Sequence, residues 1–312
     1  MVLHRMAGDH PRGVGGPLEH YAVDRTPRSR EQQADIVTMI DTHQHLWMPS
    51  ERRYDWLDVA GLPLNADFGP ELIANDAVAA EISGTILVQA ADTYEDTFYM
   101  LSVAARVPTV IGVIGWVPLD RVDEARAALD LYAGSLVRGI RVLNHTYSDP
   151  RWLLGAGGVE LLGSRGFTLD VVSTEPAHLQ MIAELATRHP ELSIVIDHLG
   201  KPDIADEGWE PWASLLAAAA TRPNVSVKLS GLNTASALGW TIADWQPYVD
   251  HAVASFGADR MMMGSDWPVS ILNGDFLGVW QAQCQVIAGL SDEQQQDILH
   301  RVAKRIYKVE IS

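Results

Sequence analysis

Short apolar runs recur along the chain from residue 36 onward, and longer segments with helical spacing separate them. Most of these runs are continuous and rich in Val and Ile, which is typical of parallel strands that are covered on both faces. The pattern predicts eight strands, at residues 36–40, 84–89, 110–116, 137–143, 167–172, 192–196, 225–229 and 260–263.

The segments between the runs are predicted to be helices. In residues 175–188, Leu179 and Ile182 lie three positions apart and begin one apolar stripe. Thr174 is the expected N-cap of this helix, and Pro176 suits its first turn, where the missing N–H costs nothing. Further helices of this kind are predicted at residues 125–132, 212–220 and 246–256. Strands that alternate with helices predict a parallel α/β fold.

Eight strand–helix units favour a closed (β/α)8 barrel, or TIM barrel, over an open doubly wound sheet. The weaker alternative, a nucleotide-binding sheet, lacks support because no GxGxxG motif follows the first strand. The active site of a (β/α)8 barrel lies at the carboxyl ends of the strands. The long insert at residues 48–75 follows the first strand, so we expect it to lie over the mouth of the site.

The chain has 312 residues, a length compatible with one barrel domain. We predict a single barrel at residues 35–312, preceded by a disordered leader at residues 1–34 that lacks apolar periodicity. The leader has no apolar segment of the kind that a secretory signal needs. Whether it is native or results from an early start codon stays open. No apolar run approaches the ~20 residues of a membrane-spanning helix.

The acidic composition and the single cysteine narrow the class of protein. The net charge is −17 with His neutral, so the long-range field should repel nucleic acid and anionic membranes. A single cysteine, Cys284, excludes a disulfide within the chain and fits a reducing compartment. We therefore expect a cytoplasmic protein that binds a small molecule. An anionic substrate would need cations supplied locally by the site.

Ionisable residues stand at the carboxyl ends of three predicted strands. His43 and His45 end the first strand, and because they lie two residues apart on an extended segment, their side chains point to the same side and suit a metal ion. His198 follows the sixth strand, and Asp266 follows the eighth, which neighbours the first strand in a closed barrel. Asp266 is therefore predicted to act as a general base, as a metal ligand, or as both.

Each of these residues also has an ordinary structural explanation. His-x-His is a weak signal in a chain with 11 histidines. His198 fits a satisfied polar pocket, Asp197 fits the cap of a turn after the strand, and Asp266 fits an N-cap before Trp267-Pro268. The strength of the prediction lies in the combination, which places three His and one Asp at one rim of one fold.

Longer motifs around these positions resemble the amidohydrolase superfamily, and within it the sugar-lactonase branch that includes L-fuconolactonase and L-rhamnonolactonase. The motifs are His43-Gln44-His45-Leu46-Trp47, Gly115-Trp116-Val117-Pro118-Leu119, Gly139-Ile140-Arg141, Asp197-His198-Leu199-Gly200-Lys201-Pro202, Lys228-Leu229-Ser230-Gly231-Leu232 and Gly264-Ser265-Asp266-Trp267-Pro268-Val269. The resemblance implies a (β/α)8 barrel that takes part in carbohydrate catabolism. It implies hydrolysis of a cyclic ester, a sugar-acid lactone (aldonolactone), by a water that Asp266 and the histidine cluster activate.

The resemblance also bears on the metal content. Binuclear members of the superfamily carry a bridging Lys or Glu at the fourth strand and a His at the fifth, whereas the fifth strand here ends in Asp170-Val171-Val172-Ser173. We therefore expect at most one divalent ion, Zn²⁺, on His43, His45 and Asp266, with His198 nearby. Catalysis without a metal stays open, because some relatives in this branch work without one and because lactones are activated esters.

The expected substrate contacts come from other strand ends and from the insert. Arg141 and Lys228 are the cations that strand position places best to meet a carboxylate or hydroxyl groups, and the alternative is that they form salt bridges inside the barrel rim. The residues predicted to line the pocket are Gln89, Trp116, Trp47, Tyr54 and Trp56. Aromatic faces suit sugar rings, although Trp is also common in ordinary packing.

Two other functions stay open from the sequence. A decarboxylase or lactone isomerase would reuse the histidines and Asp266 without adding water to the substrate. A catalytically inactive binding barrel is the more remote alternative, and the intact Asp266 and three histidines argue against it. The sequence does not indicate which lactone is used or which oligomeric state the protein has.

Overall fold

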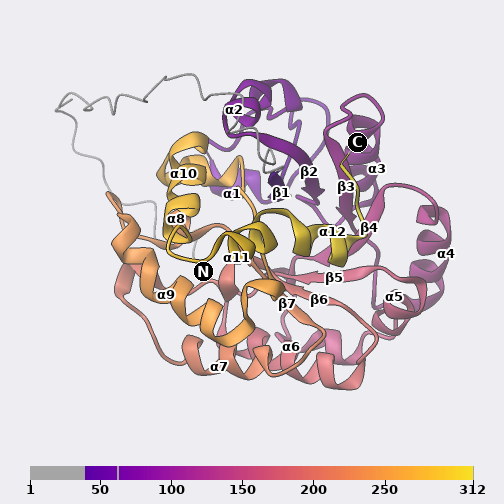
Figure 1. Cartoon of the computed structure of the whole chain (residues 1–312). Coiled ribbons are helices and arrows are strands. Elements are labelled where there is room, and N and C mark those ends of the chain that lie inside the picture. The colour runs from indigo at the N-terminus through magenta and orange to yellow at the C-terminus, as the bar shows by residue number, and fades with distance from the viewer. Residues whose placement is uncertain (1–38, 62, 312) are drawn as a thin grey trace.

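The computed structural model describes residues 39–61 and 63–311. Eight strands follow one another in the order β1 to β8 within one sheet, and each consecutive pair is parallel (Figure 1). The strands are β1 (Met39–Gln44), β2 (Ile82–Val88), β3 (Val110–Gly115), β4 (Val137–Val142), β5 (Thr168–Val171), β6 (Ile194–Ile196), β7 (Val225–Leu229) and β8 (Met261–Met263). The predicted (β/α)8 barrel is confirmed.

Helices surround the sheet on its outer side (Figure 1). They are α1 (Leu57–Ala60), α2 (Ala74–Ala79), α3 (Tyr94–Ala104), α4 (Val122–Tyr132), α5 (Val159–Arg165), α6 (Pro176–Arg188), α7 (Trp212–Ala220), α8 (Leu232–Ala235), α9 (Ile242–Phe256), α10 (Phe276–Val286), α11 (Asp292–Gln296) and α12 (Val302–Tyr307). Within the described part of the chain, none of them has the length and apolarity needed to cross a membrane.

The predicted helix boundaries are close to the observed ones. The predicted helix at 212–220 coincides with α7. The prediction that Thr174 caps α6 is wrong, because the N-cap is Glu175, which is extended at φ −154° and ψ 157°. The reason is steric: Pro176 occupies the first helical position and excludes the helical conformation from the residue before it.

The first strand differs from the predicted run at 36–40. β1 begins at Met39 and continues to Gln44, because Asp41 and Gln44 pair with β2. His43 therefore lies within the strand and not after it. The predicted leader at 1–34, the start of the predicted barrel domain, and residues 36–38 of the predicted strand lie outside the described residues.

Two apolar cores stabilise the barrel. The larger one lies between the sheet and the surrounding helices. The smaller one joins Ile86 of β2, Val195 of β6 and Met262 of β8, which lie on different sides of the barrel and so meet in its interior. Val302 and Tyr307 of α12 belong to the same cluster. The C-terminal helix therefore closes the amino-terminal end of the barrel.

Residues that follow β8 close the barrel against β1. The backbone N–H of Asp266 donates to the carbonyl of His43, and that of His45 donates to the carbonyl of Trp267, both at 2.7 Å. A Cβ on Gly264 would lie 2.6 Å from the Cβ of His43, so this close approach requires glycine. The closure thus brings Asp266 beside the two histidines.

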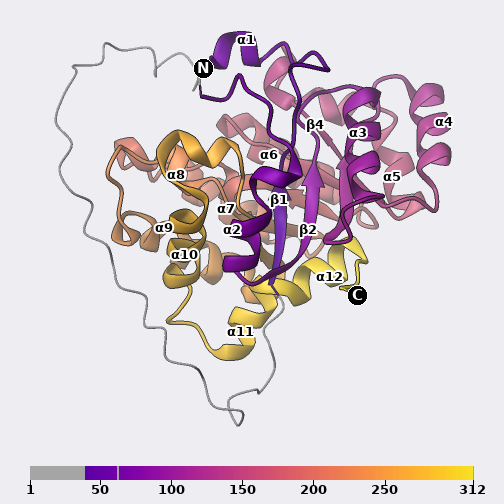
Figure 2. The same ribbon diagram turned by 90° about the horizontal axis from the view of Figure 1, so that it is seen from above.

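The insert after β1 packs over the carboxyl ends of the first strands. Trp47 pairs with Phe68 across the insert, and the indole N–H of Trp56 donates to the carbonyl of Ala90 at 2.8 Å. Figure 2 shows α1 beyond the arrowheads of the nearby strands, at the end opposite α11. The insert therefore borders the end of the barrel where the predicted site lies.

The buried Asp41 carboxylate stabilises the closure and yields a first prediction. It accepts the backbone N–H and the hydroxyl of Ser265, at 2.8 and 2.6 Å, and the backbone N–H of His43 at 3.1 Å. Asp41→Ala should lower the free energy of unfolding by about 2–4 kcal/mol, because three buried donors lose their acceptor. Urea unfolding measures the change, and Asp41→Asn, which keeps one acceptor oxygen, should lose clearly less. An alanine variant as stable as the wild type would show that these bonds do not hold the closure.

Candidate active site

His43 and His45 form a close pair at the end of β1. Their Nε2 atoms are 3.1 Å apart, as expected for residues two apart on an extended segment. The Nδ1 of His45 lies 2.8 Å from the carbonyl of Val88. Because a carbonyl can only accept, this nitrogen carries the proton and leaves the Nε2 lone pair of neutral His45 free.

Asp266 completes a set of three donor atoms. Its Oδ1 lies 3.4 Å from the Nε2 of His45 and 3.8 Å from the Nε2 of His43. Asp266 adopts a left-handed backbone at φ 54°, which directs the chain away from the strand at the rim. Burial raises the pKa of its carboxyl, but the neighbouring His198 and His45 lower it by more, so the pKa lies below its usual range. The group is therefore ionised at neutral pH.

The donor set suits one divalent cation. Burial is the main cause that holds the pKa of His43 well below its usual value, so this imidazole is neutral. Two proton arrangements satisfy the pair: His43 donates from Nε2 to His45, or it donates from Nδ1 to Asp197 and both Nε2 lone pairs converge. The second arrangement, with the Asp266 carboxylate, offers the N and O ligands that Zn²⁺ accepts. The residues present thus fit the predicted metal.

Beneath His43 lies a network of buried charges. Asp197 is fully buried, and its Oδ1 lies 3.2 Å from both the Nδ1 of His43 and the Nζ of Lys228. Its Oδ2 lies 3.3 Å from the guanidinium of Arg141. Burial raises the pKa of Asp197, but Lys228, His43 and Arg141 together hold it well below its usual range. Asp197 is therefore a permanent anion that orients His43, and not merely the cap of a turn.

The network continues towards the amino-terminal end of the barrel. Lys228 donates to Asp170 at 2.7 Å, and the hydroxyl of Tyr307 donates to the same carboxylate oxygen at 2.6 Å. Lys228 is fully buried and lies on the Nδ1 side of His43. Three neighbours occupy its ammonium, so its position does not favour the predicted substrate contact, which stays a prediction. It agrees with the alternative of a salt bridge inside the barrel.

Arg141 lies closer to the reactive atoms. One guanidinium nitrogen is 3.3 Å from the Nε2 of His43, and another donates to the carbonyl and to the side-chain oxygen of Gln89, at 2.7 and 3.3 Å. Arg141 is 5% exposed. The structure therefore brings this predicted cation to the His43–His45 pair, held in place by Asp197 and Gln89.

His198 faces the same space from the turn after β6. Its Nδ1 lies 2.9 Å from the hydroxyl of Ser230 and 3.9 Å from the Oδ2 of Asp266, and its ring centre is 4.5 Å from that of His43. Burial lowers the pKa of His198 to about 4, although the Asp266 carboxylate acts in the opposite direction. The wall opposite is Gly231, where a Cβ would lie 2.8 Å from the His198 Nδ1. His198 is thus a neutral, tightly enclosed imidazole.

The predicted aromatic lining separates into buried and accessible members. Trp47 is fully buried and donates to the carbonyl of Leu64, and Tyr54 is 4% exposed and donates to Asp96. These two rings stabilise the insert and do not present a face to a substrate. Trp56 is partly exposed, and Trp116 is 8% exposed with an indole N–H that has no partner in residues 39–61 and 63–311.

Some residues of the site carried no distinct sequence signal. Three of them contact other side chains of the site and have no predicted reactive role of their own, so no motif in the sequence indicated them. They are Asp170, Ser230 and Tyr307. Asp92 accepts the side-chain N–H of Gln89 at 2.7 Å, and burial raises its pKa to about 6. His145, in the turn after β4, belongs to neither group of potential metal ligands in the described chain.

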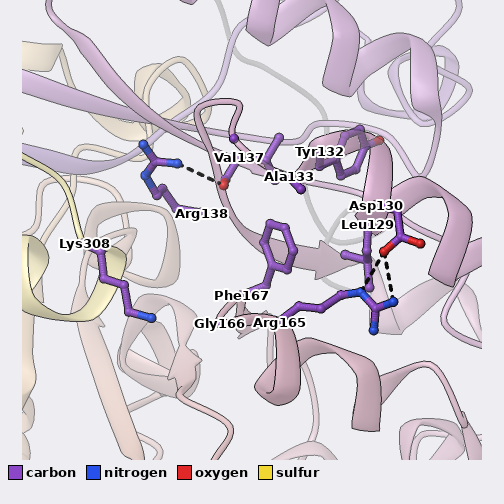
Figure 3. Close-up of a pocket in the computed structure, with 11 residues that line it drawn as sticks. Leu129, Asp130, Tyr132, Ala133, Val137, Arg138, Arg165, Gly166, Phe167 and Lys308 are labelled. Atoms are coloured by element: carbon purple, nitrogen blue, oxygen red, sulfur yellow. Dashed lines mark hydrogen bonds and ion pairs between the residues drawn. The ribbon is translucent and has the colours of Figure 1, made fainter.

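A cavity elsewhere in the described chain is distinct from this site. It has a volume of about 370 Å³ and is bordered by Val137 and Phe167, where β4 and β5 begin, and by Arg138, Arg165 and Lys308 (Figure 3). It therefore lies at the amino-terminal end of the barrel. A second cavity of about 300 Å³ borders the turn after β6.

Comparison with known proteins agrees with the geometry. The sequence model of a family described as amidohydrolase matches residues 40–309. An L-fucono-1,5-lactonase of Burkholderia ambifaria is 36% identical over 251 residues, which cover 79% of this chain and 86% of that protein. An amidohydrolase of Burkholderia multivorans, solved with bound Zn, has a TM-score of 0.80 and 27% identity over 88% of this chain and all of that one. A 5-carboxyvanillate decarboxylase of Sphingomonas paucimobilis shares the fold, with a TM-score of 0.60 and 16% identity.

The low pKa of His198 predicts a dependence of stability on pH. The folded-state pKa is about 4 and the ordinary value is 6.5, so the unfolded chain binds more protons between these values. The free energy of unfolding should therefore fall as the pH is lowered, by about 2 kcal/mol from pH 7 to pH 5 for this group. Urea unfolding of chelator-treated protein at both pH values measures it.

Two variants test whether His198 causes this pH dependence of the free energy of unfolding. His198→Asn should remove this share of the pH dependence, whereas His251→Asn on the outer helix α9 should retain it. Equal slopes in the wild type and in His198→Asn would exclude His198 as the group responsible.

Proposed function

The chain belongs to the amidohydrolase family of hydrolases, and we propose that it opens a sugar-acid lactone by adding water to the ester carbonyl. The observation that carries the proposal is the convergence of the Asp266 carboxylate with the His43–His45 pair at the carboxyl end of the barrel. The similarity to L-fucono-1,5-lactonases supports the substrate class. The open-chain sugar acid would enter carbohydrate catabolism in the cytoplasm.

Asp266 is the proposed general base. Its carboxyl is ionised at neutral pH, and the backbone N–H of Asp266 is fixed to the carbonyl of His43. The carboxylate accepts a proton from a water molecule as the water oxygen bonds to the acyl carbon. When the bond from the acyl carbon to the ring oxygen breaks, the same proton passes from Asp266 to the ring oxygen. The products are a hydroxyl group and a carboxylic acid, which loses its proton to solvent.

Arg141 and the neutral His198 are proposed to stabilise the negative charge that develops on the acyl oxygen. Arg141 lies within 3.3 Å of the Nε2 of His43 and is held by Asp197, so it needs no rearrangement during the reaction. We assign the Nδ1 of His198 as the acceptor of a hydrogen bond from the Ser230 hydroxyl. The proton of the neutral ring then lies on Nε2, which can donate to the acyl oxygen. Trp56, which is partly exposed, is the predicted aromatic residue proposed to meet a sugar ring, and the buried Trp116 offers an indole N–H that has no partner within the described residues.

His43, His45 and Asp266 would hold a single Zn²⁺, with His198 nearby. A zinc ion bound by such ligands lowers the pKa of water and polarises a carbonyl. The proposed roles of Asp266, Arg141 and His198 do not depend on it, because a lactone is already an activated ester. The ligand set is complete for one ion, and strand β5 supplies no further histidine.

Two relatives are named L-fucono-1,5-lactonase, and this similarity favours hydrolysis over decarboxylation or lactone isomerisation. The decarboxylase that shares the fold is 16% identical and supports the architecture alone. A panel of aldonolactones with a pH indicator distinguishes the reactions, because hydrolysis releases acid and isomerisation does not. Acid release above the spontaneous rate is expected, and its absence for the whole panel would contradict the proposal.

Loss of the proposed base has a defined consequence. Asp266→Asn should lower kcat by at least about a hundredfold, as is typical of removing a general base, with little change in melting temperature. Asp130→Asn, at an exposed carboxylate of α4, is the matched control and should keep full activity. An Asp266→Asn enzyme with near-normal turnover would remove this residue from its role.

The metal content is a separate prediction. Protein purified without added metal should contain no more than one divalent ion per chain, because the two groups of potential ligands among the described residues share His43 and because the Asp197 of the second group already pairs with Arg141 and Lys228. Elemental analysis gives the stoichiometry, and His45→Ala should lower it. About two tightly bound ions would contradict the mononuclear assignment. Near-zero metal with full activity would leave charge stabilisation to Arg141 and His198.

A further inference from the structure

The turn that follows β6 has an unusual backbone. Four consecutive residues adopt left-handed angles, with φ of 55° at His198, 50° at Leu199, 73° at Gly200 and 52° at Lys201. Three of them carry a Cβ, and each such residue costs roughly 1–2 kcal/mol in this conformation. Backbone strain of this kind persists where the surrounding structure imposes it, and it is concentrated at functional sites.

Packing holds this turn in place. Leu199 is fully buried, and its carbonyl accepts the indole N–H of Trp212 at 2.7 Å. The backbone N–H of Lys201 donates to the carbonyl of His198 at 2.8 Å. This bond closes a tight turn of four residues, in which the first and last side chains point in similar directions. The turn therefore places Lys201 on the same side of the backbone as His198, where Lys201 also borders the cavity of about 300 Å³ beside this turn.

Electrostatics agree with this placement. Burial lowers the pKa of Lys201, and the Asp266 carboxylate is the nearby charge that acts most strongly in the opposite direction. The ammonium of Lys201 in turn contributes to the low pKa of His198. Lys201 thus lies within electrostatic reach of the proposed base and of the imidazole beside it.

Lys201 differs from the other cations of the site in having no partner. Arg141 and Lys228 are buried and bound to Asp197, whereas Lys201 is partly exposed and makes no side-chain hydrogen bond or ion pair with residues 39–61 or 63–311. An ammonium that is partly exposed and has no partner within the described residues can bind an anionic oxygen. An oxygen of a bound ligand would supply the missing partner.

We propose that the Lys201 ammonium binds the acyl oxygen of the lactone, which becomes a carboxylate oxygen of the product. The proposal rests on the proposed lactonase function and assigns a further catalytic residue to it. Asp266 directs water to the acyl carbon, so a cation close to Asp266 meets the oxygen that gains charge as the water adds. After the ring opens, the same ammonium pairs with the carboxylate of the sugar acid.

The test compares two inhibitors that differ only at the acyl carbon. One is the aldonate product of the lactone that the enzyme hydrolyses fastest, and the other is the alditol of the same skeleton: L-fuconate and L-fucitol if the preference follows the relatives. Their inhibition constants are measured with the wild type, Lys201→Met and Lys201→Arg. Lys308→Met is the matched control, because Lys308 has the same left-handed backbone, at φ 51°, beside the cavity at the other end of the barrel (Figure 3).

Lys201→Met should weaken inhibition by the aldonate about tenfold or more, as expected for loss of a charged hydrogen bond, and should leave the alditol within about twofold. Its kcat should fall about a hundredfold, the effect of removing one donor to an oxyanion. Lys201→Arg should recover part of both losses, and Lys308→Met should show neither.

Other outcomes overturn the proposal. Equal weakening of both inhibitors would place Lys201 on a hydroxyl group or in a structural role, and unchanged constants would give it no role. In both cases the wild type would still hydrolyse the lactone, so the proposed function would stand. A wild type that hydrolyses no aldonolactone would overturn the function and this inference together.

Discussion

The buried Asp197 carboxylate is the interaction on which the candidate site depends. It contacts an imidazole from β1, a guanidinium from β4 and an ammonium from β7, so it joins three strands at the centre of the barrel. A charge in this position is tolerated only when its partners surround it closely, and removing one partner leaves an uncompensated charge. The arrangement therefore fixes where these strands end relative to one another. It also orients the His43 ring, whereas His45 is held by the carbonyl of Val88 and Asp266 by its backbone bond to the carbonyl of His43.

The same network connects the site to the base of the barrel. Lys228 forms ion pairs with both Asp197 and Asp170. The hydroxyl of Tyr307, on the C-terminal helix, donates a hydrogen bond to Asp170. Chemistry at one end of the barrel is thus supported by packing at the other. Above the network, the backbone leaves strand geometry in left-handed turns at His198 and Asp266, which direct both side chains towards one space. Fully buried neighbours such as Leu199 offset the cost of this strain.

The charges of the site compensate for those of the whole protein. A chain with a net charge of −17 repels anions at long range, yet the product of lactone hydrolysis is an anion. Two of the cations near the reactive atoms, Arg141 and Lys228, form ion pairs with the buried Asp197 and so stabilise the barrel. Lys201, by contrast, makes no side-chain hydrogen bond or ion pair with residues 39–61 or 63–311. This division between cations that build the site and one that is free for a ligand is the basis of the further inference.

Much of the fold and part of the site are encoded locally. Continuous apolar runs separated by helical segments determine eight parallel strands, because only a sheet covered on both faces buries them. The spacing of His43 and His45 determines that their rings meet, because alternate residues of a strand share a side. The roles of Asp197 and Lys228 were decided only by the tertiary structure, because an acid after a strand and a lysine within one look the same in sequence whether or not an opposite charge lies across the barrel. Trp47 belongs to the same class, since its burial depends on the insert folding back over it. The left-handed turn at Lys201 does too, because packing against Trp212, and not any local preference, holds that backbone in place.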